Sequence, residues 1–125
     1  YQKNYLVNKS QITSNIKNSK AFVIDARSKE RFLGIVPEPR KNLRSGHIPK
    51  ALNLHFKEVL QDGFLKKKEA LLELVSPLEL GKRSLIFSCG SGITACIVLL
   101  ALETVLDNPK ALYDGSWSEW GALDE

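Results

Sequence analysis

The sequence has 125 residues, of which 43% are hydrophobic and 26% charged, with a formal net charge of +4 at pH 7. That length can bury a core without disulfide or metal cross-links, and the composition gives no case for intrinsic disorder. The longest apolar run, Ala95 to Leu102, is far shorter than the roughly 20 residues of a membrane-spanning helix, and no signal segment opens the chain. We therefore expect one soluble globular domain.

The absence of methionine and the positions of the two cysteines each support an expectation. The sequence contains no methionine, which suggests a piece of a longer protein. Its two cysteines, Cys89 and Cys96, would lie about 10 Å apart along a continuous helix, beyond disulfide reach, so we expect reduced thiols and a cytoplasmic location. The basic residues are dispersed except at 66–68, a run typical of a solvated helix start rather than of a nucleic-acid site.

The first part of the chain predicts a helix, a strand and a second helix. KSQITSNIKN (residues 9–18) places two isoleucines one helical turn apart, and AFVID (residues 21–25) is a buried-strand pattern that ends at an acid. Ser28 is a candidate N-cap for a helix over SKERFLG. A long loop containing Pro and Gly is expected over residues 34–46.

The second part continues the alternation. KKKEALLELVSPLEL (residues 66–80) predicts a helix with Leu71, Leu72 and Val75 facing inward and a break at Pro77. The remaining strand candidates are YLVN (residues 5–8), ALNLHF (51–56), RSLIFS (83–88) and KALYD (110–114), and the longest helix is expected over Thr94 to Leu106.

Strands that alternate with helices predict an α/β fold with a central parallel sheet. Ligands in such sheets bind at the carboxyl ends of the strands. Asp25, Cys89 and Asp114 all lie at or just beyond the end of a predicted strand. This edge of the sheet is therefore the candidate site.

Cys89 opens the loop CGSGIT, which separates a predicted strand from the longest predicted helix. Two glycines allow successive backbone N–H groups to converge on the sulfur, the helix N-terminus adds positive potential, and the hydroxyls of Ser91 and Thr94 can donate hydrogen bonds. Together these features can lower a thiol pKa and create a nucleophile. The residues alone support equally a buried structural thiol, and for Cys96 a core position is expected.

Two other uses of the cysteine loop are disfavoured. A cysteine phosphatase requires an arginine after a five-residue loop, and Ala95 occupies that position. No Cys or His pair has zinc-type spacing, so no metal site is expected. His47 is expected to make a structural hydrogen bond, and His55 is expected to be exposed without a role.

Three separated motifs resemble the rhodanese family of sulfurtransferases, in particular the cysteine-bearing second domain of its two-domain members. DARSKERFLGIVPEPRKNLRSGHIPKALNL (residues 25–54) is similar to that domain's first signature, and LYDGSWSEWG (residues 112–121) is similar to its C-terminal signature. CGSGIT lies between them as a six-residue active loop. The resemblance implies a parallel sheet of about five short strands with helices on both faces, spanning residues 1–125.

The resemblance also implies a reaction without metal or organic cofactor. Cys89 thiolate would take sulfur from a small-molecule donor, hold it as a persulfide, and pass it to a thiol, thioredoxin or cyanide. In the loop, Gly90, Gly92, Ile93 and Thr94 would bind the donor and the transferred sulfur. Members that prefer thiosulfate have two basic residues after the cysteine, whereas Gly90 and Ser91 make this loop similar to that of 3-mercaptopyruvate sulfurtransferases.

In those relatives two arginines bind the carboxylate and carbonyl of the donor, and they match Arg31 and Arg40. The alternative for each is an ion pair, for instance with Glu38 or Asp25; Arg27 and Arg44 are not expected to touch the donor. Ser91 matches a serine of a proton relay. Asp25 and Asp114 are expected to brace loops, while Trp117 and Trp120 are expected to pack the C-terminal helix.

One departure concerns the partner domain. Two-domain members form the active-site cleft between their domains, and the first domain supplies the relay partners of the loop serine. An N-terminal rhodanese-like domain is therefore expected in the parent chain. The alternative to an enzyme is a non-catalytic rhodanese-like module that binds partners or carries persulfide, although the retained cysteine loop does not favour it.

Overall fold

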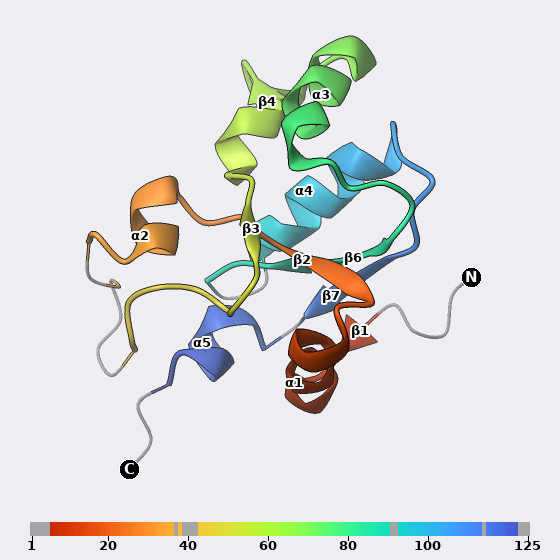
Figure 1. The fold of residues 1–125 in the computed structure, drawn as a ribbon. Helices are drawn as coiled ribbons and strands as arrows, with labels where there is room; N and C mark the ends of the chain where they lie inside the picture. Colours follow the sequence, from red (N-terminus) through yellow and green to blue (C-terminus); the bar gives the residue numbers. More distant parts are fainter. Residues whose placement is uncertain (1–5, 37, 39–42, 91–92, 114, 123–125) are drawn as a thin grey trace.

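The computed structural model describes residues 6–36, 38, 43–90, 93–113 and 115–122. The strands and helices alternate along the chain, as expected (Figure 1). In chain order they are β1 (Leu6–Val7), α1 (Lys9–Asn18), β2 (Ala21–Asp25), α2 (Lys29–Leu33), β3 (Leu52–Asn53), the 3₁₀ helix η1 (Phe56–Val59), β4 (Leu60–Gln61), β5 (Phe64–Leu65), α3 (Lys68–Val75), the 3₁₀ helix η2 (Ser76–Leu78), β6 (Ser84–Ser88), α4 (Ile93–Glu103), β7 (Lys110–Tyr113) and α5 (Ser116–Trp120).

The central sheet has five strands in the order β1-β7-β6-β2-β3, and every pairing is parallel. Because the strands are parallel, their carboxyl ends share one edge, where Asp25 of β2 pairs with Ser88 of β6. This confirms the predicted fold class. The hairpin of β4 and β5 is a separate antiparallel pair that the sequence patterns did not reveal.

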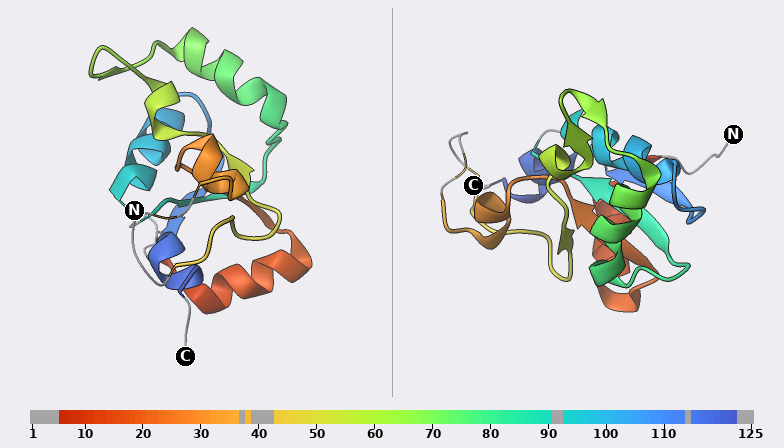
Figure 2. Two further views of the ribbon diagram at one scale, coloured as in Figure 1. Left: turned by 90° about the vertical axis from the view of Figure 1, so that its left-hand side faces the viewer. Right: turned by 90° about the horizontal axis from the view of Figure 1, so that it is seen from above.

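Helices cover both faces of the sheet (Figures 1 and 2). Successive strand residues point to opposite faces, so Ile24 packs in the cluster that contains α3 and α4, whereas Val23 packs in the cluster with α1 and α5. The expected strand near the N-terminus is confirmed as β1, at the edge beside β7. No helix in the described part of the chain is long and apolar enough to span a membrane.

Local signals account for several element boundaries. The side chain of Ser28 accepts the backbone N–H of Arg31, which confirms it as the N-cap of α2. The first helix has a capping box in which Asn8 and Gln11 exchange side-chain and backbone hydrogen bonds. Pro77 lies in the 3₁₀ turn that follows α3, as the break predicted there requires.

Three burial predictions were wrong. Leu72 is 46% exposed, because it lies beside the inward row of α3 that Leu71 and Val75 occupy. Cys96 is exposed rather than in the core, since α4 turns its neighbours Ala95 and Val98 inward instead. His55 is half-buried rather than exposed, and burial lowers its pKa.

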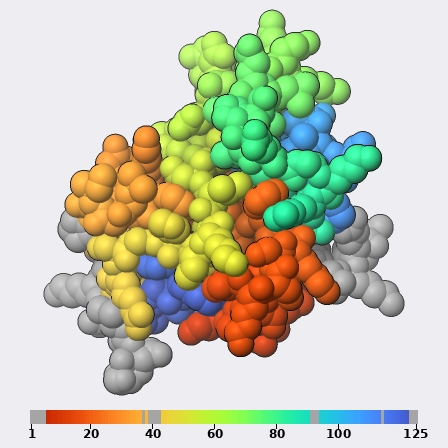
Figure 3. Space-filling model, in the orientation of Figure 1, coloured from red at the N-terminus to blue at the C-terminus, as the bar shows by residue number. Residues whose placement is uncertain are grey.

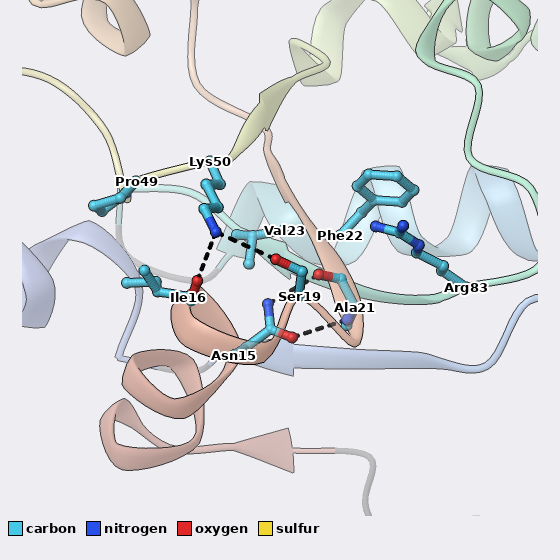
Figure 4. Close-up of a pocket in the computed structure, with 9 residues that line it drawn as sticks. All are labelled: Asn15, Ile16, Ser19, Ala21, Phe22, Val23, Pro49, Lys50 and Arg83. Carbon is cyan, nitrogen blue, oxygen red and sulfur yellow. Dashed lines mark hydrogen bonds between the residues drawn. The ribbon is translucent and has the colours of Figure 1, made fainter.

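Figure 3 shows the yellow segment around residue 50 against the red N-terminal part, on the face where β2 and the loop before β3 meet. A cavity of about 120 Å³ lies here, at the amino end of β2 and beside the end of α1 (Figure 4). The ammonium group of Lys50 donates to Ile16 O at 2.9 Å and to Ser19 Oγ at 3.3 Å. The Asn15 amide exchanges two hydrogen bonds with the backbone of Ala21. The polar groups of this cavity therefore hold α1 against the sheet.

Candidate active site

Cys89 follows β6 directly, at the carboxyl edge of the sheet, and is 1% exposed. The backbone of Cys89 and Gly90 is held by α5 through three hydrogen bonds. Cys89 N–H donates to Ser116 Oγ at 3.0 Å, Trp117 N–H donates to Cys89 O at 2.8 Å, and Ser118 N–H donates to Gly90 O at 2.9 Å. The C-terminal signature thus positions the cysteine, a function that its sequence did not reveal.

Ser116 adopts φ +50°, in the left-handed region that non-glycine residues seldom occupy. Its hydroxyl is fully buried and donates its single hydrogen to Tyr113 O at 2.8 Å, so toward Cys89 N–H the same oxygen acts as the acceptor. Backbone strain of this kind persists where neighbouring contacts hold it. Here those contacts join the end of β7 to the cysteine loop.

Gly90 also has an importance that its sequence did not reveal. Its φ is not in the left-handed region, so the backbone conformation itself does not demand glycine. A Cβ at this position would lie 2.9 Å from Nη2 of Arg31, closer than real Cβ contacts allow. The absence of a side chain at Gly90 therefore makes room for the Arg31 guanidinium beside the cysteine loop.

Arg31 belongs to a chain of four charged groups. Its Nη2 donates to Glu38 Oε1 at 2.7 Å and its Nε to Glu38 Oε2 at 3.3 Å. Glu38 Oε2 also accepts a hydrogen bond from Arg27, whose Nη1 lies 3.0 Å away. Arg27 in turn binds Asp25 through Nε and Nη2, with the shortest contact at 2.7 Å. The ion pair considered from the sequence as an alternative role thus exists for Arg31, with Glu38, whereas the ion pairs of Arg27 were not considered from the sequence.

The burial of this cluster is uneven. The side chains of Asp25, Arg27 and Glu38 are between 0% and 3% exposed, whereas that of Arg31 is 30% exposed. The Arg27 guanidinium also stacks over the Trp117 ring at 4.6 Å. Within the cluster, Arg31 is therefore the group that solvent and a ligand can reach.

Trp117 links the two signature segments. Its indole Nε1–H donates to Arg44 O at 2.7 Å, and its side chain is buried against the loop before β3. Trp120 is half-buried, with the Lys9 ammonium 5.7 Å from its ring centre. Packing roles for both tryptophans are confirmed, and Arg44 enters through its backbone rather than its charge.

Tyr113, at the end of β7, fastens α5 from the other side. Its hydroxyl donates to Glu119 Oε1 at 2.6 Å. Burial first, and then this bond to a carboxylate, raises the pKa of Tyr113 well above its usual value. The tyrosine is therefore neutral and a hydrogen-bond donor across the physiological pH range.

The remaining candidates are placed as follows. Arg40, Ser91, Gly92 and Asp114 lie outside the described residues, so their predicted roles stay predictions. Ile93 and Thr94 form the first turn of α4. His47 Nδ1 bonds to Phe32 O at 2.7 Å and its ring stacks on Phe32, which is the structural role expected. Among the described residues, no group of three or more His, Cys, Asp or Glu side chains forms a metal site.

Sequence reasoning missed the contribution of Ser116 and gave Glu38 only as one possible ion-pair partner of an arginine. Both lie inside recognised motifs, but their importance comes from contacts with residues distant in sequence. The positive φ of Ser116 leaves no signal in the sequence. Glycine is the residue that usually marks such a conformation, and here the glycine stands one position earlier, at 115. The charge alternation in residues 25–38 was the available hint for a cluster of paired acids and arginines.

A parallel α/β sheet with a cysteine at the carboxyl end of a central strand, followed by a short loop and a helix, is an arrangement that suits a reactive thiol. The chain belongs to the rhodanese family, since the family model for the rhodanese-like domain matches residues 8–123.

Curated relatives show which members of the rhodanese family the chain is similar to. The chain is 50% identical to 3-mercaptopyruvate sulfurtransferase of Escherichia coli K12 over 104 residues, which covers 82% of this chain and 37% of the relative. It is 37% identical to 3-mercaptopyruvate sulfurtransferase of Homo sapiens over 111 residues, covering 87% of this chain and 37% of the relative. The chain therefore spans well under half the length of these curated relatives.

Solved structures agree. The crystal structure of Tum1 protein from Saccharomyces cerevisiae superposes with a TM-score of 0.84 at 30% identity, over 96% of this chain and 44% of that chain. SseA from Escherichia coli, described as a 3-mercaptopyruvate sulfotransferase with the rhodanese fold, superposes with a TM-score of 0.77 at 40% identity, over 95% of this chain and 44% of that one. These likenesses confirm the resemblance stated from the motifs.

Proposed function

We propose that this chain is the cysteine-bearing domain of a sulfurtransferase that takes sulfur from 3-mercaptopyruvate and passes it to a thiol, thioredoxin or cyanide. The observation that carries the proposal is Cys89 at the carboxyl end of β6 in a rhodanese domain, with the Arg31 guanidinium beside the next residue, Gly90. The identity to 3-mercaptopyruvate sulfurtransferases supports this donor over thiosulfate.

In the first half-reaction, the Cys89 thiolate attacks the sulfur of the donor. The S–S bond of a persulfide forms while the C–S bond of the donor breaks, and its electron pair passes to the enolate of pyruvate, which then takes a proton. Backbone N–H groups of the loop stabilise the anionic sulfur before and after the transfer. Ser91 is the proposed proton relay, and Thr94 the proposed hydroxyl contact to sulfur.

In the second half-reaction, an acceptor thiolate or cyanide attacks the outer sulfur. The persulfide S–S bond breaks, its electron pair returns to Cys89, and the thiolate is restored. All covalent steps are thus nucleophilic displacements at sulfur. The proposed reaction needs neither a metal nor an organic cofactor. Arg31, together with Arg40, is proposed to bind the carboxylate and carbonyl of the donor through paired N–H groups.

The relatives are more than twice as long as the matched region, which supports a second domain completing the cleft in the parent protein. We propose an N-terminal rhodanese-like domain for that role. We also propose a cytoplasmic location, where thiols remain reduced. A relative from Arabidopsis thaliana is named as mitochondrial, so cell fractionation of the parent protein is the appropriate check.

Mass spectrometry of the complete protein tests the proposal. Treatment with 3-mercaptopyruvate should add one sulfur atom to the peptide that contains Cys89, and Cys89→Ser should abolish the gain. Because Cys96 is exposed, a Cys96→Ala background removes the competing thiol. An unmodified wild-type protein would contradict the proposal, and a persulfide that reaches only a protein partner and no small acceptor would indicate a carrier instead.

A further inference from the structure

Glu38 lies between two arginines with its side chain fully buried, and it contacts both of them. We propose that Glu38 is a positioning residue that holds Arg31 side-on beside Gly90, and that the resulting arrangement selects a donor with one planar carboxylate over a dianionic donor. The inference rests on the proposed function and deepens it, because it assigns the donor preference to a residue that does not itself bind the donor.

The hydrogen bonds divide the Arg31 guanidinium into two edges. Glu38 occupies the edge formed by Nε and Nη2, with contacts of 3.3 and 2.7 Å. A guanidinium carries five N–H donors, so the outer edge formed by Nη1 and the second N–H of Nη2 keeps the paired geometry that suits a carboxylate. The ion pair therefore orients Arg31 for a ligand instead of consuming it.

Glu38 itself has little freedom to move. Its side chain is 0% exposed, and Oε2 also accepts from Nη1 of Arg27 at 3.0 Å. Arg27 is anchored to Asp25 on its other side and to Gly46 O. Arg31 is thus fastened, through Glu38, to a buried framework at the carboxyl edge of the sheet.

Gly90 sets the second boundary of the Arg31 position. Nη2 belongs to both edges of the guanidinium. It lies only 2.9 Å from the position that a Cβ on residue 90 would occupy. A carboxylate bound on the outer edge would therefore lie next to the residue that follows Cys89. This proximity brings a short α-keto acid thiol within reach of the nucleophile.

The charge of the cluster explains the selection. Asp25 and Glu38 supply two carboxylates, and Arg27 and Arg31 supply two guanidinium groups, so the four together are formally neutral. A dianion gains little from a neutral cluster, whereas a planar carboxylate gains two directed hydrogen bonds. With Gly90 also uncharged, the described part of the site recognises geometry rather than net charge.

Steady-state kinetics of the complete protein provide the first test, with Glu38→Gln and Gly90→Ala as variants. The first loosens Arg31 from its anchor, and the second displaces Nη2 by steric contact while leaving Glu38 and Arg27 intact. Each should raise KM for 3-mercaptopyruvate between about tenfold and a hundredfold, the range of a charged hydrogen bond, with kcat nearly unchanged. The ratio of thiosulfate to 3-mercaptopyruvate kcat/KM should rise by a similar factor.

Glu103→Gln is the matched control, because it removes a carboxylate that pairs with the buried Lys110 at the opposite end of α4. It should leave both KM values and their ratio at wild-type levels. If Glu38→Gln does not fold, Glu38→Asp, which keeps the charge and shortens the side chain, tests the same contact with Arg31, and Gly90→Ala tests only the space beside Nη2. An equal loss with both donors, or a fall in kcat without a change in KM, would overturn the positioning role.

Binding of pyruvate, which has the carboxylate but no transferable sulfur, separates this inference from the proposed function. An NMR titration should give a dissociation constant for wild type that rises about tenfold or more in Glu38→Gln or, if that variant does not fold, in Glu38→Asp. If wild type forms no persulfide but shows this difference, the sulfurtransferase proposal fails and the positioning role stands. If persulfide forms while pyruvate binds wild type and variant equally, the positioning role fails alone.

Discussion

The hydroxyl of Ser116 accepts the backbone N–H of Cys89 at 3.0 Å and donates to Tyr113 O at 2.8 Å. One buried side chain thereby ties the end of β7 to the first residue of the cysteine loop. Because the neighbouring N–H groups of α5 hold Cys89 O and Gly90 O, the loop backbone is anchored at three successive polar groups.

Ser116→Ala should destabilise the fold by about 1–3 kcal/mol, since the buried N–H of Cys89 loses its acceptor. Urea unfolding monitored by fluorescence measures this difference. Thr104→Val is the matched control, because Thr104 also donates to the carbonyl three residues earlier but lies at the end of α4. Equal stability of Ser116→Ala and wild type would mean that the hydroxyl does not hold the loop.

Arg27→Met should cost about 3–5 kcal/mol, because it leaves Asp25 buried without its ionic partner and removes one of the two partners of Glu38. Arg83→Met is the comparison, since Arg83 also stacks on an aromatic ring, 4.8 Å from the centre of Phe22, but is exposed. It should cost under about 1 kcal/mol. Chemical denaturation of the two variants side by side checks the contrast, and similar losses would argue against a structural role for the buried ion pairs.

Tyr113→Phe should change the alkaline limb of the stability profile. The folded state raises the pKa of Tyr113 above the value near 10 that it has when unfolded. Above that pH the unfolded chain releases the proton while the folded chain retains it, so stability falls as pH rises. Removing the hydroxyl should flatten this fall above about pH 10 and leave the slope near pH 7 unchanged. A wild-type slope at high pH in the variant would refute the assignment.

Gly121→Ala should destabilise the C-terminal signature by about 1–3 kcal/mol, the usual cost of overpacking. A Cβ at this position would overlap the Trp117 ring, which stacks on Arg27 and donates to Arg44 O. The tryptophan fluorescence maximum should shift along with the unfolding midpoint. An unchanged unfolding midpoint and fluorescence maximum would show that the Trp117 ring does not need the space beside Gly121.

Much of the fold was predictable because each strand signal is local. The apolar runs at residues 21–25, 83–88 and 110–114 became β2, β6 and β7, and the intervening patterns became helices. The hairpin of β4 and β5 was missed because each strand has only two residues, too few for a period to show. Cys96 and Leu72 were misplaced because apolar residues on a helix can face outward.

The sequence by itself determined the parallel α/β class, the place of Cys89 after a central strand, and the likeness to rhodaneses, because these depend on local patterns and ordered motifs. Only the tertiary structure decided that Ser116 holds Cys89, that Glu38 holds Arg31, and that Gly90 leaves room for that arginine. The reason is physical: strand order and helix packing bring these groups together, and the direction of a hydrogen bond or the space beside a Cα does not exist until they meet.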